Sequence, residues 1–136
     1  MIDKDLKQRI HEKVEEGEFG PSDIPAYLDL LVQIAGETQD VKDEVAGWDR
    51  RIQFRFDGTD DAWITVAGGA FGHGAGSLDT ADLVLSIAAG PAAQLFSGAR
   101  DAKAAYMAGQ LKIEGAIPDA LKVQNILTIV NEEIEY

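Results

Sequence analysis

Several residue types that would signal a particular class of protein are missing or scarce. There is no cysteine among the 136 residues, so neither a disulfide framework nor thiolate chemistry is available. No apolar run approaches the roughly 18 residues that a membrane-spanning helix needs. The first residues are charged where a signal peptide requires an apolar core, and the last residues do not form a peroxisomal address. We therefore expect a cytoplasmic protein.

Basic residues are also scarce, because 12 Lys and Arg stand against 24 Asp and Glu, and the formal net charge is −12. Since phosphate groups repel such a chain, we expect no nucleic-acid partner and at most transient contact with membranes. Residues 1–49 hold 13 acidic and 5 basic side chains, a net charge of −8, and the remainder contributes −4. This acidity is typical of a solvated surface, and docking onto a basic partner is the alternative.

Only two histidines are present, and neither belongs to a spaced motif of metal ligands. His11 lies among Lys and Glu, and His73 lies in the glycine-rich segment 68–77, GGAFGHGAGS. A phosphate-binding loop would require a helix directly after the glycines, whereas Leu78 leads into another strand. We interpret the segment as a turn and a third strand, in which missing side chains let another group pack close to the backbone. We expect neither a metal nor a cofactor.

Length and a 46% apolar content favour one domain over residues 1–136. Its first part, 1–46, is predicted to be helical. The first helix, 1–16, carries an apolar residue every fourth position from Ile2 to Val14. A second helix follows from Ser22 to Gly36, and a short third one covers 38–46. The apolar face of the first helix could also pair with a second copy, so a homodimer is kept as an alternative.

The period changes in the second part, 47–136. Residues 51–57 alternate between apolar and polar, residues 62–67 are rich in aromatic and β-branched side chains, and turn residues lie between them, which predicts a hairpin. Residues 82–88 are apolar on both faces, so this strand is expected inside the sheet rather than at its edge. A short helix over 89–96 should follow, with a glycine after its end.

The segment 101–130 contains three clearly separated elements. Asp101 is expected to cap a helix that ends near Gly109, residues 110–114 alternate like a half-buried strand, and Pro118 suits the first turn of the last helix. Five strands with helices gathered at both ends of the chain predict an α+β fold. We expect a single five-stranded, mainly antiparallel sheet that helices cover on one face.

The same segment resembles the sterol carrier protein type 2 family. The run AYMAGQLKIEG at 105–115 is similar to the family's strand, in which a hydrophobic residue and Gly precede Leu-Lys-Ile-x-Gly. The run ALKVQNI at 120–126 is similar to the Ala-Met/Leu-Lys-Leu-Gln segment that opens its last helix, and 82–98 resembles its Asp-x-x-Leu-x-Ile strand and following helix. The resemblance is strongest over 82–130, reaches loosely back to Gly47-Trp48-Asp49, and covers little of the first 40 residues.

The resemblance implies an elongated apolar tunnel between sheet and helices that accepts sterols, fatty acyl chains or acyl-CoA. The candidate ligand-binding residues lie on the three helices expected to form its walls, and they are Leu95, Phe96, Tyr106, Met107, Leu121, Gln124, Leu127 and Val130. Met107 suits an adaptable wall because its thioether is flexible. Gln124 matches the family's Gln, and its amide could bind a ligand hydroxyl or carbonyl. Ordinary core packing, or for Gln124 a cap on neighbouring backbone, is the alternative.

The resulting hypothesis is non-enzymatic binding and carriage of a hydrophobic ligand. Specificity should be broad, because each methylene contributes only about 0.8 kcal/mol. An interaction module or accessory subunit beside a lipid- or acyl-CoA-metabolising enzyme is the alternative, since the acidic N-terminal helices replace the basic helix with which animal members are thought to meet membranes. An enzyme would need a buried acid or base, for which Asp82, Asp101 and His73 are the candidates. Each of these also has a structural interpretation, so no catalytic residue is expected.

Overall fold

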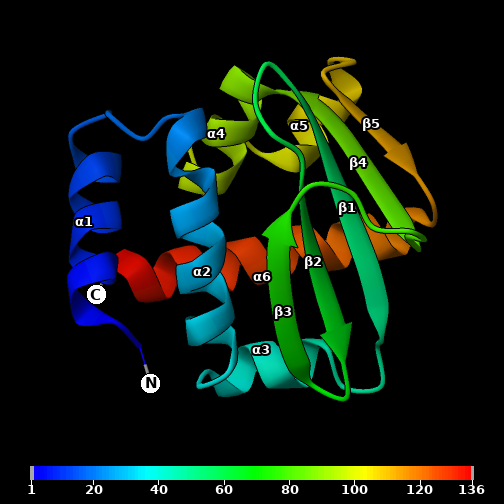
Figure 1. Cartoon of the computed structure of the whole chain (residues 1–136), viewed down its shortest axis with the longest axis horizontal. Coiled ribbons are helices and arrows are strands. Elements are labelled where there is room, and N and C mark those ends of the chain that lie inside the picture. The colour runs from blue at the N-terminus through cyan, green and yellow to red at the C-terminus, as the bar shows by residue number, and fades with distance from the viewer. Residues whose placement is uncertain (1, 136) are drawn as a thin grey trace.

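The computed structural model describes residues 2–135 (Figure 1). Its first part contains the helices α1 (Lys4–Glu15), α2 (Ile24–Ala35) and α3 (Gln39–Glu44), with a 3₁₀ turn at Pro21–Asp23. The strands β1 (Arg50–Asp57), β2 (Ala62–Ala67), β3 (Ala70–Ala75) and β4 (Leu83–Ala88) follow. The last part comprises α4 (Ala89–Ser97), α5 (Ala102–Met107), β5 (Leu111–Glu114) and α6 (Ile117–Glu135). Among the described residues, none of the helices combines the length and apolarity needed to cross a membrane.

The five strands form one sheet in the order β3-β2-β1-β4-β5. Three of the four strand pairs are antiparallel, as expected, and β1 with β4 is the parallel pair. The expected hairpin of β1 and β2 is confirmed, and β4 lies inside the sheet between β1 and β5. The sheet is therefore mixed. β4 can run parallel to β1 because the segment between β3 and β4 first carries the chain back along the sheet.

A buried glutamine on the outer face of β1 holds this return connection. The Gln53 side chain donates from Nε2 to the carbonyl oxygens of Ala62 and Gly76, at 3.1 and 2.9 Å, and its Oε1 accepts from the Leu78 amide at 2.7 Å. Gln53 is only 2% exposed for that reason. The connection crosses the sheet in front of β1 and ends where the Asp82 carboxylate accepts from the Arg51 amide.

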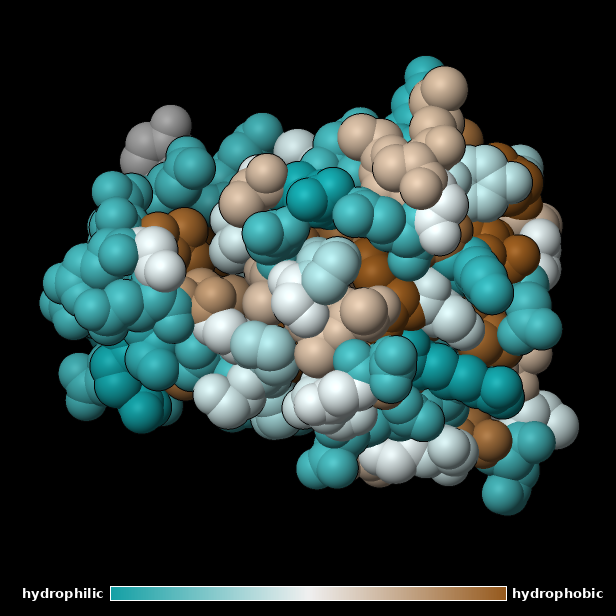
Figure 2. All heavy atoms as spheres, turned by 90° about the horizontal axis from the view of Figure 1, so that it is seen from above, coloured by the Kyte–Doolittle hydropathy of each residue, from teal (hydrophilic) through white to brown (hydrophobic). Residues whose placement is uncertain are grey.

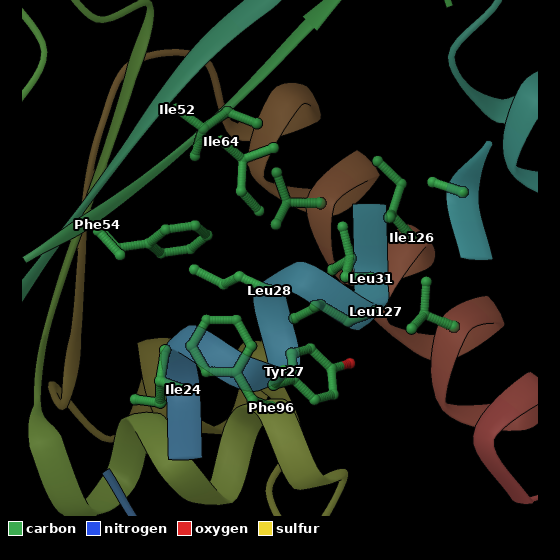
Figure 3. Packing of buried hydrophobic residues seen from close by; sticks show 14 of the residues in the cluster. Ile24, Tyr27, Leu28, Leu31, Ile52, Phe54, Ile64, Phe96, Ile126 and Leu127 are labelled. Carbon is green, nitrogen blue, oxygen red and sulfur yellow. The ribbon is translucent and has the colours of Figure 1, made fainter. Parts of the chain in front are cut away.

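The strands present alternate side chains to two environments. On β1, Ile52, Phe54 and Phe56 are buried on the inner face, whereas Arg51 and Arg55 on the outer face are exposed. One continuous hydrophobic core joins the inner face to the helices that cover it, and Figure 3 shows side chains of the sheet, α2, α4 and α6 meeting there. The predicted α+β fold, with helices over one face of a five-stranded sheet, is confirmed.

The N-terminal helix packs on its own chain. Asp3 caps α1 by accepting from the amides of Asp5 and Leu6 at 3.0 and 3.1 Å. Leu6 and Ile10 of the predicted apolar stripe are 5% and 2% exposed, because α1 lies against α2 and α6. A dimer formed through this face therefore loses its basis, since the face is already covered.

The glycine-rich strand β3 behaves as the sequence predicted. Trp63 of β2 lies directly across from Gly74 in the register of the pair, and a Cβ built on Gly74 would stand only 2.6 Å from Cε2 of the indole. A Cβ on Gly72 would stand 2.8 Å from the Thr65 hydroxyl. Because Gly72 and Gly74 have no side chains, Thr65 and Trp63 of β2 can lie over the edge strand β3. A phosphate-binding loop would lead directly into a helix, whereas the residues after β3 lead to β4.

The start of α6 is anchored by the carboxylate of Asp119, which follows Pro118 in the first turn of the helix. Asp119 is 9% exposed, and it accepts from Trp48 Nε1 at 2.8 Å and from Arg50 Nε at 2.9 Å. The Trp48 hydrogen bond and the Arg50 guanidinium hold the pKa of this carboxyl below its ordinary value, although burial opposes them. Lys122 lies over the Trp48 ring and donates to the Glu44 carbonyl at 2.8 Å. The last helix is thus fixed to the α3–β1 connection.

Candidate functional site

The candidate site is an apolar cavity of about 490 Å³ between the inner face of the sheet and the helices α4, α5 and α6. Its volume falls within the roughly 300–1,000 Å³ of small-molecule sites. Every lining residue except Asp101, Lys103 and Gln124 is apolar or aromatic. Such a site offers a ligand burial of apolar surface and very few hydrogen bonds.

The strands form the floor of the cavity. Their alternation places every second side chain on the inner face, so three neighbouring strands contribute Phe54, Phe56, Leu85, Ile87, Leu111 and Ile113. The three helices form the walls, with Ala92, Leu95 and Phe96 from α4, Ala102, Tyr106 and Met107 from α5, and Ile117, Ala120, Leu121, Val123, Gln124 and Leu127 from α6.

An aromatic cluster closes the inner end of the cavity. Phe96 packs edge-on against Phe54 and Phe56, with ring centroids 5.5 and 6.2 Å apart. It also meets Tyr27, with ring centroids 5.3 Å apart, and Figure 3 shows Phe96 between Phe54 and Tyr27. Tyr27 is fully buried and donates its hydroxyl to Asn131 Oδ1 at 2.7 Å. Burial raises the pKa of this phenol far above its ordinary value. Phe96 thus separates the cavity from the densely packed core under α2.

The opposite end of the cavity is open to solvent. Four large apolar side chains of the described residues are exposed, and all four line the cavity: Tyr106 at 47%, Met107 at 76%, Ile117 at 45% and Leu121 at 52%. We call these four residues the mouth rim. Figure 2 shows hydrophobic atoms gathered on the half of the molecule that contains α5 and β5, whereas the α1 end is mostly hydrophilic. An exposed apolar rim that continues into an apolar cavity is a natural entry for a hydrophobic ligand.

Gln124 faces the cavity, but its amide is already engaged. Its Oε1 accepts from the Ala102 amide at 3.1 Å, and its Nε2 donates to the Thr128 hydroxyl at 3.2 Å. Asp101 has the extended backbone of an N-cap residue, as predicted, but its side chain makes no capping hydrogen bond to α5. Gln124 therefore satisfies the first free N–H of α5 from a different helix.

The predicted site residues can now be placed. Leu95, Phe96, Tyr106, Met107, Leu121, Gln124 and Leu127 all lie in the cavity wall, and their role in ligand binding stays a prediction. Val130 does not lie there. It is fully buried in the core, because the C-terminal half of α6 runs beyond the cavity and packs on α1 and α2.

The predicted site residues included neither the floor of the cavity nor several residues of its helical walls. The missing wall residues are Ala92, Asp101, Ala102, Lys103, Ile117, Ala120 and Val123. The floor residues of β1 and β5 could have been found, because alternation already identified the apolar face of these strands, whereas β4 is apolar on both faces and gave no such signal. Ile117 stands before the predicted start of the helix, so only the observed start shows that it faces the mouth.

The three candidate acids and bases have different surroundings. His73 lies on the far edge strand with Nε2 3.5 Å from the Asp29 carboxylate, so it has a partner that no sequence spacing indicated. Asp82 is bound to the β1 backbone. Asp101 alone lines the cavity, where it is exposed to water. Among the described residues, no group of three His, Asp or Glu side chains could hold a metal ion.

Solved structures share this architecture at low sequence identity. Sterol carrier protein 2 from Yarrowia lipolytica, in its apo form, superposes with a TM-score of 0.61 and 19% identity over 76% of this chain and 88% of that one. The sec-alkylsulfatase Pisa1 from Pseudomonas sp. matches with a TM-score of 0.59 and 21% identity, over 76% of this chain but only 15% of the sulfatase. These likenesses establish the fold.

The sequence comparisons are more specific. Hydroxysteroid dehydrogenase-like protein 2 from Mus musculus is 37% identical over 86 residues, which is 60% of this chain. The matched part spans only 17% of the mouse protein. The sequence profile of the SCP-2 sterol transfer family matches residues 29–128, which include the sheet, the mouth rim and every residue that lines the cavity. The chain therefore belongs to the SCP-2 sterol transfer family.

Proposed function

We propose that this chain binds lipids with one long apolar body, such as fatty acyl chains or sterols, in the cavity, and that it carries them without chemical change. The cavity is the observation that supports this function: about 490 Å³ of space lined almost wholly by apolar side chains and bordered by the exposed mouth rim. The family and the fold of the sterol carrier proteins support the same ligand class.

The energetics fit a carrier of broad specificity. A dozen buried methylenes contribute on the order of 10 kcal/mol, at about 0.8 kcal/mol each, before the costs of association. Those costs remove several kcal/mol and leave micromolar or tighter binding. Because each methylene changes the affinity only a few-fold, ligands of similar length should compete with one another.

The placement of the acids and bases supports carriage rather than catalysis. His73 and Asp82 do not line the cavity, and Asp101 stands at its water-exposed end. A general acid or base within the apolar part of the cavity is what an enzyme acting on the ligand would require. Delivery of the ligand to a separate enzyme is a second candidate, because the mouse relative, named as dehydrogenase-like, is much longer than this chain.

The test is to fill the cavity and measure binding. Ala120 is half-buried in the α6 wall, so Ala120→Trp places an indole in the space that a ligand would occupy. The control is Ala116→Trp, at an exposed residue outside the lining. Titration with a fluorescent fatty acid should show affinity at least about tenfold weaker for Ala120→Trp alone, corresponding to the loss of two or more methylene contacts.

Extraction and mass spectrometry of the purified protein should also detect co-purified lipid, and less of it in Ala120→Trp. Two results would overturn the proposal: wild-type protein that neither retains lipid nor binds the fluorescent fatty acid, or equal affinity in both tryptophan variants. Delivery to an enzyme would gain support if a stable complex transferred the bound fatty acid to that enzyme.

A further inference from the structure

The mouth rim has an exposure that ligand binding alone does not explain. Its four side chains are the large apolar residues exposed among residues 2–135, and they stand together on α5 and the first turns of α6. A cavity needs apolar side chains that face inward. Met107, at 76% exposure, presents most of its surface to the outside instead.

The charge around the mouth differs from the rest of the chain. The segment 99–114, which contains α5 and β5, carries Arg100, Lys103 and Lys112 against Asp101 and Glu114, a net charge of +1 in a protein of −12. Arg100 donates to the neutral amides of Gln94 and Gln110. Electrostatic repulsion from a lipid headgroup layer is therefore weaker around α5 and β5 than the net charge of the whole chain would suggest.

We propose that the mouth rim docks on a phospholipid surface and that the ligand passes directly between bilayer and cavity. Tyr106 provides an amphipathic ring at the headgroup level, and Met107, Ile117 and Leu121 reach the acyl boundary. This inference rests on the proposed carrier function and adds the surface through which the carrier is loaded and emptied.

Two other occupants of the rim fit less well. A second copy would need roughly 800 Å² of surface from each partner, whereas four side chains of roughly 200 Å² each, about half exposed, offer on the order of 400 Å². The ends of the described chain lie at the α1 side of the molecule, away from α5 (Figure 1). A lipid surface needs no matched shape and accepts a small apolar tip.

The docking surface can be changed without touching the cavity. Ala104 and Ala108 are exposed on or directly after α5 and do not line the cavity. Ala104→Glu/Ala108→Glu places two carboxylates beside the rim. The matched control, Ala46→Glu/Ala67→Glu, makes the same change in net charge at exposed alanines after α3 and at the end of β2, at the opposite end of the molecule from α5. Ala104→Lys/Ala108→Lys tests whether any effect comes from perturbing the helix rather than from charge.

The measurement is the rate at which bound fluorescent fatty acid moves to phosphatidylcholine vesicles. Direct contact predicts that the wild-type rate rises with vesicle concentration, and that Ala104→Glu/Ala108→Glu lowers it at least about fivefold, because carboxylates resist insertion at the interface. The control and the lysine variant should keep rates near the wild type, and ligand affinity without vesicles should be the same in all four proteins.

Flotation of the ligand-free proteins with the same vesicles separates this inference from the proposed function. If wild type binds no fatty acid but floats, and the glutamate variant does not, docking stands and the carrier function fails. The inference is overturned by a rate independent of vesicle concentration, by equal slowing in the glutamate and lysine variants, or by equal slowing in both glutamate variants. A wild-type dimer that the glutamate variant dissociates, with unchanged flotation, would assign the rim to a second copy instead.

Discussion

At the scale of single residues, Gln124 links the cavity to the stability of its mouth. Its amide oxygen accepts from the first N–H of α5, so this side chain holds the short mouth helix onto α6. A ligand that hydrogen-bonded the same amide would compete with the helix for it. Capping and ligand recognition therefore make different predictions for a substitution here.

Gln124→Leu should loosen α5 more than it weakens binding. The lost hydrogen bonds should lower the free energy of unfolding by about 1 kcal/mol, and amide exchange at Ala102 should become faster. Thr128→Val is the control, because it removes the partner of Nε2 and leaves the bond to Ala102 in place. If exchange at Ala102 stayed unchanged while affinity for a hydroxylated ligand fell, the amide would be a recognition group instead.

Asp119 gives the fold a pH dependence whose sign follows from its lowered pKa. A carboxyl with a lowered folded pKa stabilises the protein above its unfolded pKa, near 3.8, and loses that contribution as the pH falls through the folded value. Asp119→Asn keeps an acceptor for Trp48 but loses the charge beside Arg50. We expect this substitution to lower the free energy of unfolding by about 1–3 kcal/mol at pH 6.

The difference in the free energy of unfolding between wild type and Asp119→Asn should shrink as the pH falls from about 5 toward about 3, because the wild-type carboxyl becomes neutral. Urea unfolding at several pH values measures this difference. Asp40→Asn, at an exposed site on α3, removes the same charge and serves as the control. A difference that stayed constant across this range would mean that the charge of Asp119 does not stabilise the fold.

At the scale of elements, the pairing of β2 with β3 depends on missing side chains. Gly74→Ala introduces a Cβ into the space of the Trp63 ring, so either the indole or the edge strand must move. We expect a loss of about 1–3 kcal/mol in the free energy of unfolding. Thermal and urea unfolding measure it, and combination with Trp63→Leu should recover part of the loss.

Gly90→Ala in α4 is the matched control for that substitution. A Cβ at Gly90 meets nothing within 4 Å, and its φ lies outside the left-handed region. Alanine should therefore stabilise the protein by about 0.4–1 kcal/mol, since it restricts the unfolded chain. If Gly74→Ala and Gly90→Ala lowered the free energy of unfolding equally, the loss at Gly74 would not come from the contact with the Trp63 ring.

The elements themselves could be predicted because their signals are local. Alternation identified β1 and β5, aromatic and β-branched content identified β2, and Pro and Gly marked the helix ends around Gly98 and Pro118. The parallel pairing of β4 with β1 could not be predicted, because local patterns do not show that the segment before β4 returns along the sheet, where Gln53, more than 20 residues earlier, binds it. Similarly, no spacing shows that Asp119 meets Trp48, 71 residues earlier in the chain.

At the scale of the whole molecule, the cavity wall and the core are built from the same residue types. Leu127 lines the cavity and Val130, three residues later, is core, although both read as apolar positions of one helix. Empty space depends on how α5 and α6 stand relative to the sheet, which periodicity does not encode. The expectation of a cavity therefore came from the family resemblance, and the structure was needed to separate its wall from the core.

A carrier with an open apolar cavity should be markedly stabilised by its ligand. Fatty acid at about 100 times its Kd adds about 2.7 kcal/mol to the free energy of unfolding, which raises the Tm by roughly 10 °C in a chain of this size. The shift should grow with the logarithm of ligand concentration, and delipidation should lower the Tm of freshly purified protein. At the same fatty-acid concentrations, calorimetry should show a much smaller rise in the Tm of Ala120→Trp. Equal shifts in both proteins would place the stabilising fatty acid outside the cavity and contradict the proposed site.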